Sequence, residues 1–547
     1  QVRLCHDGEW HTVLVDDCLP CIQLQGGPLM GSPGVPAFAY AARRQLWVSL
    51  VEKAYAKLYG CYEALEGGST DEALATLTGF PCEKLDLRHA RKLRRRRGGS
   101  GGGSCLEDDE ALTASAAGSG ELLDPELLWA KLLSFHDAGF LMSVSCGGDD
   151  AEAAAAADAM GLLSDHAYSL LRVVDVRVPS GPAAGRMARL VQLRNPWGKL
   201  EWRGDWSDTS ALWTPELRAS LYAAASNDGT FWMELEDLID YFRSIDACRV
   251  RPDWAEVRIG GQLPQLGAFS TGHVGGFDLS VLENTAVEVS LIQKNGRGRL
   301  DHQMADLLVL VLQRTSVEDA EGIGGLRLVA SSERQLRACV TCEVVLTAGK
   351  YYVLPISLRP RNTDMPGADA ELPYVVRIGS ARPLLCEPTA LSDQEVAAAL
   401  ASYVKAGDRE HRAFDGMSVY SRHDSAGWLS YAENTTSRKS FRIELDESGS
   451  FNVLPSRGSL VTMDVLPPGR GQLLQVLTHG FADDGSRMSC SMRFACDYVS
   501  RETHSPEVAG GVCTPLPLHA SAQTTSAYGV DGGLHDLLSA MGFRFIG

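Results

Sequence analysis

The chain has 547 residues, and at roughly 150 residues per domain this length predicts about three or four domains, each with its own core. Hydrophobic residues make up 45% of the chain, yet no apolar run approaches the ~18 residues of a membrane span. The 51 Lys and Arg against 69 Asp and Glu give a net charge of −18, so we expect no nucleic-acid partner. Fourteen cysteines are too few for a disulfide scaffold, and no signal-peptide pattern opens the chain, so we expect a cytoplasmic location.

The first segment combines a short strand with a long helix. Residues 11–15 are typical of a strand, and apolar residues at helical spacing predict a helix over 46–59. A basic run at 89–97 then passes into the Gly/Ser-rich stretch 98–104. We interpret both as one solvated, flexible insertion, because they offer little to bury, although such runs also occur in proteins that bind nucleic acid.

The next segment predicts a small sheet with a helix. We expect a helix at 124–135, a strand at 140–145, an alanine-rich insertion at 153–157 and two strands at 167–178 and 187–193. Four of the ten tryptophans follow within 17 residues, which indicates a rigid apolar wall.

From about residue 254 the sequence is rich in strands. Val287, Val289 and Leu291 alternate with polar residues, and the apolar run 307–312 predicts a buried strand. This pattern, with further strands at 340–346, 350–358 and 372–378, is typical of an antiparallel β-sandwich. Ser392 and Glu395 have the spacing of a capping box, which predicts a helix to about residue 404. A second strand-rich unit follows, with strands expected at 417–421, 440–445, 450–454, 472–477 and 488–494.

Two residues fit one catalytic mechanism. His166 opens a predicted strand, and Asn195 follows the next strand 29 residues later. A thiol protease needs a thiolate, an imidazole that accepts and returns its proton, and a side chain that fixes the imidazole's tautomer. Asn195 suits the third role, and Trp197 is placed to shield the Asn–His hydrogen bond. From spacing alone, a structural role for this His and Asn stays open.

The run His166-Ala-Tyr-Ser, the run Leu193-Arg-Asn-Pro-Trp-Gly and the run Asp228-Gly-Thr-Phe-Trp-Met resemble the second half of a calpain protease core. Upstream, Val15-Asp-Asp-Cys-Leu-Pro and Tyr62-Glu-Ala-Leu-Glu-Gly-Gly resemble the end of its first half. Gly458-Ser-Leu-Val-Thr-Met-Asp-Val-Leu-Pro-Pro and the segment from His504 are similar to the C-terminal domain of the small-optic-lobes, or calpain-15, branch of that family.

The resemblance implies that His166 and Asn195 are catalytic and that Trp197 is their shield. It also implies a nucleophilic cysteine in a Gly-Asp-Cys-Trp type of motif, which this sequence lacks, so we expect the chain to be truncated before Gln1 and inactive alone. Cys5, Cys18, Cys21 and Cys146 do not have the local pattern of that nucleophile.

The resemblance further implies a calcium site. The acidic loop positions of the family match Glu201, Asp208 and Asp228, but Thr230 stands at a further acidic position and supplies no carboxylate. A solvated acidic loop is the alternative. The pairs Cys18/Cys21 and Cys339/Cys342 have the spacing of zinc ligands, but we interpret them as buried free thiols.

We therefore predict a multidomain α+β protein, with a papain-like calpain core whose first half is incomplete and two antiparallel β-sandwich-type domains. The predicted segments are first half-core 1–88, flexible insertion 89–120, second half-core 121–253, C2-like sandwich 254–388, small-optic-lobes-type domain 389–505 and tail 506–547. The implied function is a calcium-dependent cysteine endopeptidase for limited intracellular proteolysis of protein substrates, with calcium-bridged membrane or protein contacts through the sandwich. The alternative is a catalytically inactive binding or regulatory module.

Overall fold

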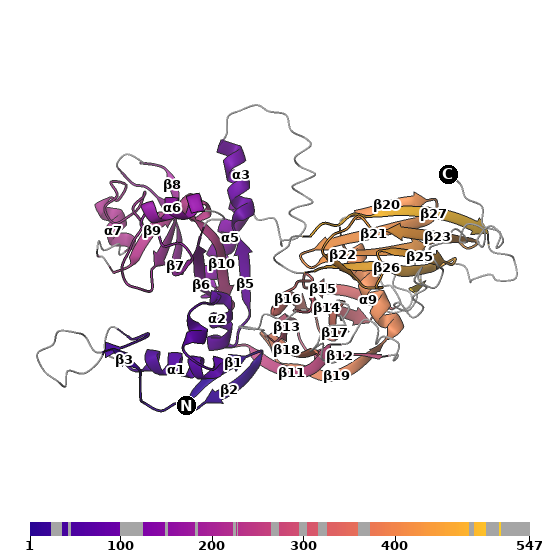
Figure 1. Ribbon diagram of the computed structural model, residues 1–547, viewed down its shortest axis with the longest axis horizontal. Helices are drawn as coiled ribbons and strands as arrows, with labels where there is room; N and C mark the ends of the chain where they lie inside the picture. The colour runs from indigo at the N-terminus through magenta and orange to yellow at the C-terminus, as the bar shows by residue number, and fades with distance from the viewer. Residues whose placement is uncertain are drawn as a thin grey trace, which may run out of the picture. The chain divides into compact units, whose positions relative to one another are not determined.

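The computed structural model describes residues 1–22, 35–41, 45–98, 124–147, 151–180, 184–221, 226, 228–263, 273–294, 304–314, 325–358, 372–407, 409–480, 486–498 and 514–515. The chain divides into two compact units, one up to Pro252 and one from Asp253, and each is described by itself. Figure 1 shows the first unit as a mixture of helices and strands, whereas the second consists mainly of strands with helix α9 among them. This is the multidomain α+β organisation that the sequence predicts.

The first unit is built around a six-stranded antiparallel sheet in the order β5-β10-β6-β7-β8-β9. One apolar cluster includes Leu128, Val144 and Phe231, and a second includes Trp206, Trp213 and Trp232. Its elements are β1 (Val2–His6), β2 (Glu9–Val13), β3 (Cys21–Ile22), β4 (Val35–Pro36), α1 (Trp47–Tyr59), the 3-10 turn Glu63–Leu65, α2 (Thr70–Thr78), β5 (Cys82–Asp86), α3 (Arg88–Gly98), α5 (Pro125–Asp137), β6 (Leu141–Cys146), α6 (Ala151–Ala159), β7 (His166–Arg177), β8 (Met187–Arg194), α7 (Pro215–Leu221), β9 (Thr230–Glu234), α8 (Leu235–Tyr241) and β10 (Phe242–Cys248).

Two segments of this unit differ from the sequence prediction. The basic run is helix α3 rather than a loop, because Ala90 is buried and the Arg91 side chain donates to the carbonyls of Ile239 and Phe242. The prediction of a loop assumed that this run had little to bury, and these tertiary contacts, which also offset its like-charge repulsion, were not visible in the sequence. The alanine tract is also helical, as α6, and buries Ala157. Residues 99–120, the rest of the expected insertion, lie outside the described residues, as do the first three residues of the expected second half-core.

The second unit consists of stacked layers. A four-stranded sheet (β11-β18-β13-β16) packs on a five-stranded sheet (β15-β14-β17-β12-β19), and helix α9 follows. Beyond α9 lie the sheet β20-β21-β22-β26-β24, with β28 beside β26, and the sheet β25-β23-β27. Both sandwiches of the prediction are thus present.

The bounds of these elements are β11 (Ala255–Leu263), β12 (His273–Val281), β13 (Thr285–Gln293), β14 (Leu307–Arg314), β15 (Leu326–Ser331), β16 (Cys339–Leu346), β17 (Gly349–Ser357), β18 (Leu372–Ser380), β19 (Leu384–Ser392), α9 (Asp393–Lys405), β20 (Arg409–Phe414), β21 (Met417–Asp424), β22 (Gly427–Asn434), β23 (Lys439–Asp446), β24 (Val453–Pro455), β25 (Val461–Leu466), β26 (Arg470–His479), β27 (Ser491–Tyr498) and β28 (Thr514–Pro515). Apart from β28, the expected tail lies outside the described residues.

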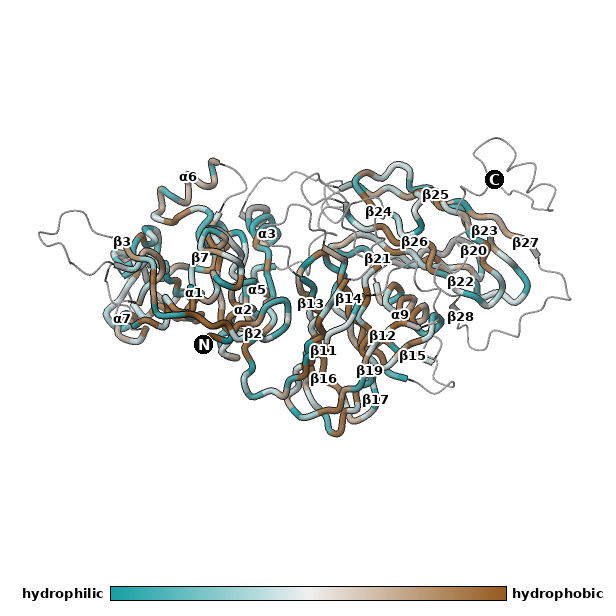
Figure 2. Tube along the Cα trace, turned by 60° about the horizontal axis from the view of Figure 1, so that its bottom comes forward, coloured by the Kyte–Doolittle hydropathy of each residue, from teal (hydrophilic) through white to brown (hydrophobic). Residues whose placement is uncertain are grey.

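Helix α9 joins the two sandwiches. The Ser392 side chain caps its first turn and Glu395 returns the bond, which confirms the predicted capping box. Its small and apolar residues are buried between β14 of one sandwich and β22 and β26 of the other, and Figure 2 shows its hydrophobic colouring. Strand β14 is buried on both faces, as predicted, because its even-numbered residues pack toward α9 and its odd-numbered residues into the first sandwich.

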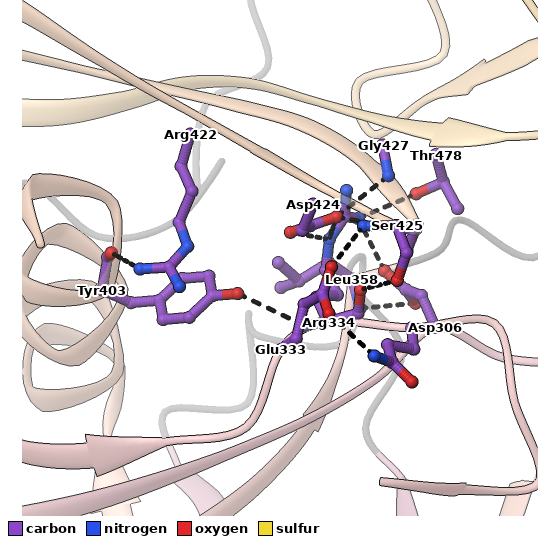
Figure 3. A network of polar contacts seen from close by, with 12 residues as sticks. Asp306, Glu333, Arg334, Leu358, Tyr403, Arg422, Asp424, Ser425, Gly427 and Thr478 are labelled. Carbon is purple, nitrogen blue, oxygen red and sulfur yellow. Dashed lines mark hydrogen bonds and ion pairs between the residues drawn. The ribbon is translucent and has the colours of Figure 1, made fainter. Parts of the chain in front are cut away.

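A buried arginine reinforces this junction (Figure 3). Arg334, which is fully buried, pairs with Asp306 of the first sandwich through Nη1 at 2.8 Å and with Asp424 of the second through Nε at 3.0 Å. Nη1 also donates to Thr478 Oγ1 at 3.1 Å, and the Arg334 N–H donates to the Tyr403 hydroxyl of α9. The guanidinium therefore links the two sandwiches, and the Arg334 backbone adds a bond to α9.

Candidate active site

The structure brings His166 and Asn195 into direct contact. His166 is the first residue of β7, and Asn195 directly follows β8. Because Ser169 of β7 pairs antiparallel with Arg194 of β8, the start of β7 and the end of β8 lie at the same end of the sheet. His166 Nε2 therefore lies 3.0 Å from Asn195 Oδ1. The two residues thus meet because β7 and β8 pair antiparallel.

The orientation of the Asn195 amide is fixed by its surroundings. Asn195 is fully buried, its Oδ1 accepts from the Trp197 N–H at 3.0 Å, and its Nδ2 donates to the Leu200 carbonyl at 3.3 Å. Because Oδ1 only accepts hydrogen bonds, the hydrogen shared with the imidazole belongs to His166 Nε2. The Nδ1 atom of neutral His166 therefore keeps its lone pair and is the ring's available base.

Two aromatic rings contact the imidazole. The Trp197 ring lies 4.6 Å from the His166 ring between centroids, and 60% of Trp197 remains exposed. Tyr168, which is buried, meets the imidazole edge to face at 5.1 Å. Its hydroxyl accepts from the Leu163 N–H, which ties the turn before β7 to the strand. The imidazole is thus held between a buried and an exposed ring.

Gly229 holds the Asn195 loop in place, a role that the sequence analysis missed. Its carbonyl accepts from the Asn195 N–H at 2.8 Å, and its N–H donates to Glu201 Oε1 at 2.7 Å. Its φ is +83°, and a Cβ there would lie 2.8 Å from the Asn195 carbonyl oxygen. The Asp-Gly pair at 228–229 is a turn signal that could have indicated this position.

Cys146 is the register partner of His166 across strands β6 and β7. Its side chain is buried and its Sγ donates to the Tyr241 carbonyl at 3.6 Å. Burial raises the pKa of the Cys146 thiol to about 12, and the negative charges of Asp158 and Asp165 act in the same direction. A thiolate nucleophile requires the opposite shift, so this site keeps Cys146 neutral.

Residues 1–249 match the family described as calpain family cysteine protease, and residues 402–501 match the calpain-D-like C-terminal domain. The first 249 residues belong to the calpain family of cysteine proteases. The family assignment thus places the His166–Asn195 pair inside a calpain-type domain.

Individual calpains are similar to this chain over different lengths. The calpain-type cysteine protease DEK1 of Arabidopsis thaliana is 33% identical over 393 residues, which cover 66% of this chain and 16% of that protein. Mouse Calpain-5 is 34% identical over 269 residues, or 46% of this chain and 36% of Calpain-5. The Calpain-2 catalytic subunit of mouse is 30% identical over 250 residues, or 45% of this chain and 29% of that protein. The chain therefore spans only about a sixth of the plant relative and about a third of the two mouse relatives.

The three carboxylates expected to bind calcium lie on the loops beside Asn195. Burial raises the pKa of Asp208, and the negative charges of Glu201 and Asp228 raise it further. Glu201 accepts from Gly229, and Asp228 accepts from the Ser226 hydroxyl and the Thr230 N–H. Within the described ranges, no three His, Cys, Asp or Glu side chains are placed to hold a metal ion. The donors fit calcium in kind, but Glu201 and Asp228 are turned toward other partners.

Among the described residues, neither CxxC pair belongs to a group of three or more side chains that could hold a metal ion. Cys342 is buried and Cys339 half-buried, but Cys18 and Cys21 are exposed, so the expectation that all four are buried is wrong for the first pair. In the part of the chain that the structure describes, no helix combines the length and apolar character needed to cross a membrane.

Proposed function

We propose that the His166–Asn195 pair is the general-base half of a calpain-type cysteine endopeptidase that cleaves protein substrates in limited fashion. The observation that carries this proposal is the 3.0 Å bond between His166 Nε2 and an Asn195 amide whose orientation two further hydrogen bonds fix. His166 Nδ1 accepts the proton of a cysteine thiol, the thiolate attacks the peptide carbonyl, and the imidazolium returns the proton to the leaving amine. Asn195 keeps the imidazole in the tautomer that this cycle requires, and Trp197 shields their bond from water.

We propose that none of the 12 described cysteines is the nucleophile. Cys146, the one that is paired in register with His166, is held as a neutral thiol in the core. The test is calcium-dependent casein cleavage by this chain alone, for which we expect no product. Cleavage that disappears in both Cys146→Ser and His166→Ala would show that Cys146 serves as the nucleophile. A folded chain that never acquires activity in any context would favour the alternative, a calpain-like binding or regulatory module.

Calcium is the cofactor we propose, held by Glu201, Asp208 and Asp228. Its positive charge would relieve the repulsion that raises the pKa of Asp208. Because Glu201 also binds Gly229, which binds Asn195, an ion here adjoins the catalytic loop. Thr230 supplies no carboxylate, so we expect weaker binding than a fully acidic site would give.

The domain limits and cellular context of the prediction remain proposals. We propose that 254–388 and 389–505 are two β-rich modules that follow the protease core in the sequence. The match of 402–501 to a calpain-D-like C-terminal domain supports the second module. We also propose that the chain belongs to the small-optic-lobes branch of the family. We propose a cytoplasmic location and calcium-bridged contacts of the first sandwich with membranes or proteins. Co-sedimentation of the chain with anionic vesicles at millimolar calcium tests those contacts, and absence of binding would refute them.

A further inference from the structure

The second sandwich contains a cavity of about 480 Å³ that the proposed function does not use. Residues of β21 and β22 line it from one sheet, and residues of β27 and the segment before it line it from the other. Two packed sheets lie about 10 Å apart, so side chains from both sheets meet in one layer. Apolar residues such as Val419, Leu477 and Phe494 form part of the lining, and side chains with sulfur and imidazole atoms form another part.

One short segment brings three sulfur atoms to this cavity. Met488, Cys490 and Met492 occupy alternate positions of the chain, and all three line the cavity. The Ser450 hydroxyl holds the backbone of this segment, because it accepts from the Ser489 N–H and donates to the Ser489 carbonyl, both at 3.0 Å. A fixed backbone therefore presents two thioethers and a thiol to the same space.

An imidazole and an indole ring line the same cavity. His423 of β21 is the register partner of Trp428 of β22, and their ring centroids lie 6.3 Å apart. The face of a Trp ring attracts a cation that lies within about 6 Å of it. His423 and Cys490 are exposed, whereas Trp428 is buried, so solvent reaches the cavity on the side of His423 and Cys490.

Acidic residues near the cavity favour a cation. Desolvation raises the pKa of the Cys490 thiol to about 12, and the negative charges of Glu447 and Asp446 act in the same direction. Glu447 is fully buried, and among the described residues its Oε1 has no hydrogen-bond partner. The charges that oppose a thiolate at this place attract a cation, and a bound cation would compensate for them.

The donor atoms of the cavity suit a soft metal ion. Thioether and thiolate sulfur select Cu(I), whereas Ca²⁺ and Mg²⁺ take oxygen ligands. Zinc is bound by Cys, His and carboxylates, and in the described ranges no three such side chains are placed to hold a metal ion. Iron–sulfur clusters need several cysteines, whereas Cys490 is the one cysteine among the described residues that line this cavity.

We infer that this cavity binds a single Cu(I) ion. Its ligands are the side chains of Met488, Cys490, Met492 and His423, and the Trp428 ring lies beside the ion. Cys490 binds as its thiolate, so each bound ion releases one proton to solvent. Such a site is independent of the proposed protease function, because all of its residues lie in the second unit. The alternative is that the two methionines only fill the sandwich, since both pack against its apolar core.

The test titrates the whole chain with Cu(I) in the absence of oxygen and follows methionine methyl groups by NMR after carbon-13 labelling. Exposed cysteines outside the cavity would compete for the metal, so the parent chain for this test carries Cys18→Ser, Cys21→Ser and Cys61→Ser. We expect the methyl resonances of Met488 and Met492 to shift and to saturate at one Cu(I) per chain. Competition with the chelator bathocuproine disulfonate gives the affinity.

Two variants and a matched control separate metal binding from packing. Met488→Leu with Met492→Leu keeps the apolar volume but removes both thioethers. We expect this variant, and Cys490→Ser, each to weaken Cu(I) binding about tenfold or more. The control is Met417→Leu with Met463→Leu, two methionines of the same sandwich that are not among the cavity residues, and it should stay within about twofold. Urea unfolding checks that all of these chains stay folded.

Four results would contradict a Cu(I) site. Parent affinity in Met488→Leu with Met492→Leu would reduce both side chains to core packing. Methyl resonances of Met488 and Met492 that stay unshifted while Cu(I) binds would place the metal elsewhere. Equal shifts with Zn²⁺ would exclude selection of a soft ion. Shifts of the same methyl groups by indole, and none by Cu(I), would make the cavity a site for an apolar ligand.

Discussion

Replacing Arg334 with Met should destabilise the second unit severely. The guanidinium is fully buried and pairs with two carboxylates, Asp306 and Asp424, that are themselves buried (Figure 3). Removing one partner of a buried ion pair costs about 3–5 kcal/mol, because the remaining charge stays uncompensated in the interior. Arg334→Met leaves two such charges at the junction of the sandwiches, so we expect a loss at the upper end of that range. A typical domain is stable by only about 5–15 kcal/mol, so the variant should lose a large part of its stability.

The assay is urea unfolding of the whole chain, with the transition of the second unit followed by hydrogen exchange of its strands. The control is Arg382→Met, because Arg382 is exposed and its ion pair with Glu283 is long, at 3.9 Å, so we expect a change below about 1 kcal/mol. Adding Asp306→Asn and Asp424→Asn to Arg334→Met should recover part of the stability. A loss below about 1 kcal/mol in Arg334→Met itself would refute the claim that this cluster holds the sandwiches together.

The same cluster predicts a pH dependence. Burial raises the pKa of Asp424 to about 6, although Arg334 acts to lower it. A carboxyl whose pKa is higher in the folded state than in the unfolded state binds more protons when folded, so its contribution to stability grows as pH falls from about 7 toward 5. Without Arg334 the pKa of Asp424 should rise further. We therefore expect the destabilisation in Arg334→Met to be smaller at pH 5 than at pH 8, and an equal loss at both values would contradict this cause.

Three further predictions concern the loops and the helix. Gly229→Ala should lower the thermal stability of the first unit more than Gly185→Ala does. Both glycines have φ +83°, but of these two only Gly229 has neighbouring atoms that an added Cβ would meet. Equal losses would show that backbone strain alone sets the cost. Ser392→Ala should cost about 1 kcal/mol in urea unfolding, because it removes the cap of α9, and no change would mean that burial alone defines that helix end. Calcium should raise the melting temperature of the first unit in the parent chain and in an Asp253→Asn control, but not in Asp208→Asn. If Asp208→Asn responded to calcium as the parent chain does, this calcium site would be excluded.

Local sequence patterns predicted the elements whose causes are local. The capping box set the start of α9, and the all-apolar run of β14 predicted its burial. Strand β13 shows what such patterns leave out, because Glu288 and Ser290, the polar residues of its alternation, are both fully buried. Glu288 is paired with Arg377 of the neighbouring strand, 89 residues away, and that pairing has no local signal.

The candidate site was predictable in its residues but not in its geometry. The family resemblance singles out His166 and Asn195, yet only the β7–β8 register shows that their side chains meet. The hydrogen bonds of Gly229 to Asn195 and Glu201 join segments that are distant in the sequence, and so do the bonds that anchor α3 through Arg91. Sequence periodicity carries no information about such contacts, which explains why the basic run was expected to be a loop.

The central claim is that His166 and Asn195 serve a calpain-type cysteine protease, and a chimaera tests it most directly. Residues 124–249 replace the corresponding segment of the Arabidopsis calpain-type cysteine protease DEK1, and casein cleavage is measured in the chimaera and in its His166→Ala and His136→Ala forms. His136, at the end of α5, is the matched control histidine. The account predicts cleavage that survives His136→Ala and disappears in His166→Ala. A folded chimaera that fails to cleave casein while its parent does, or one that cleaves without His166, would contradict it.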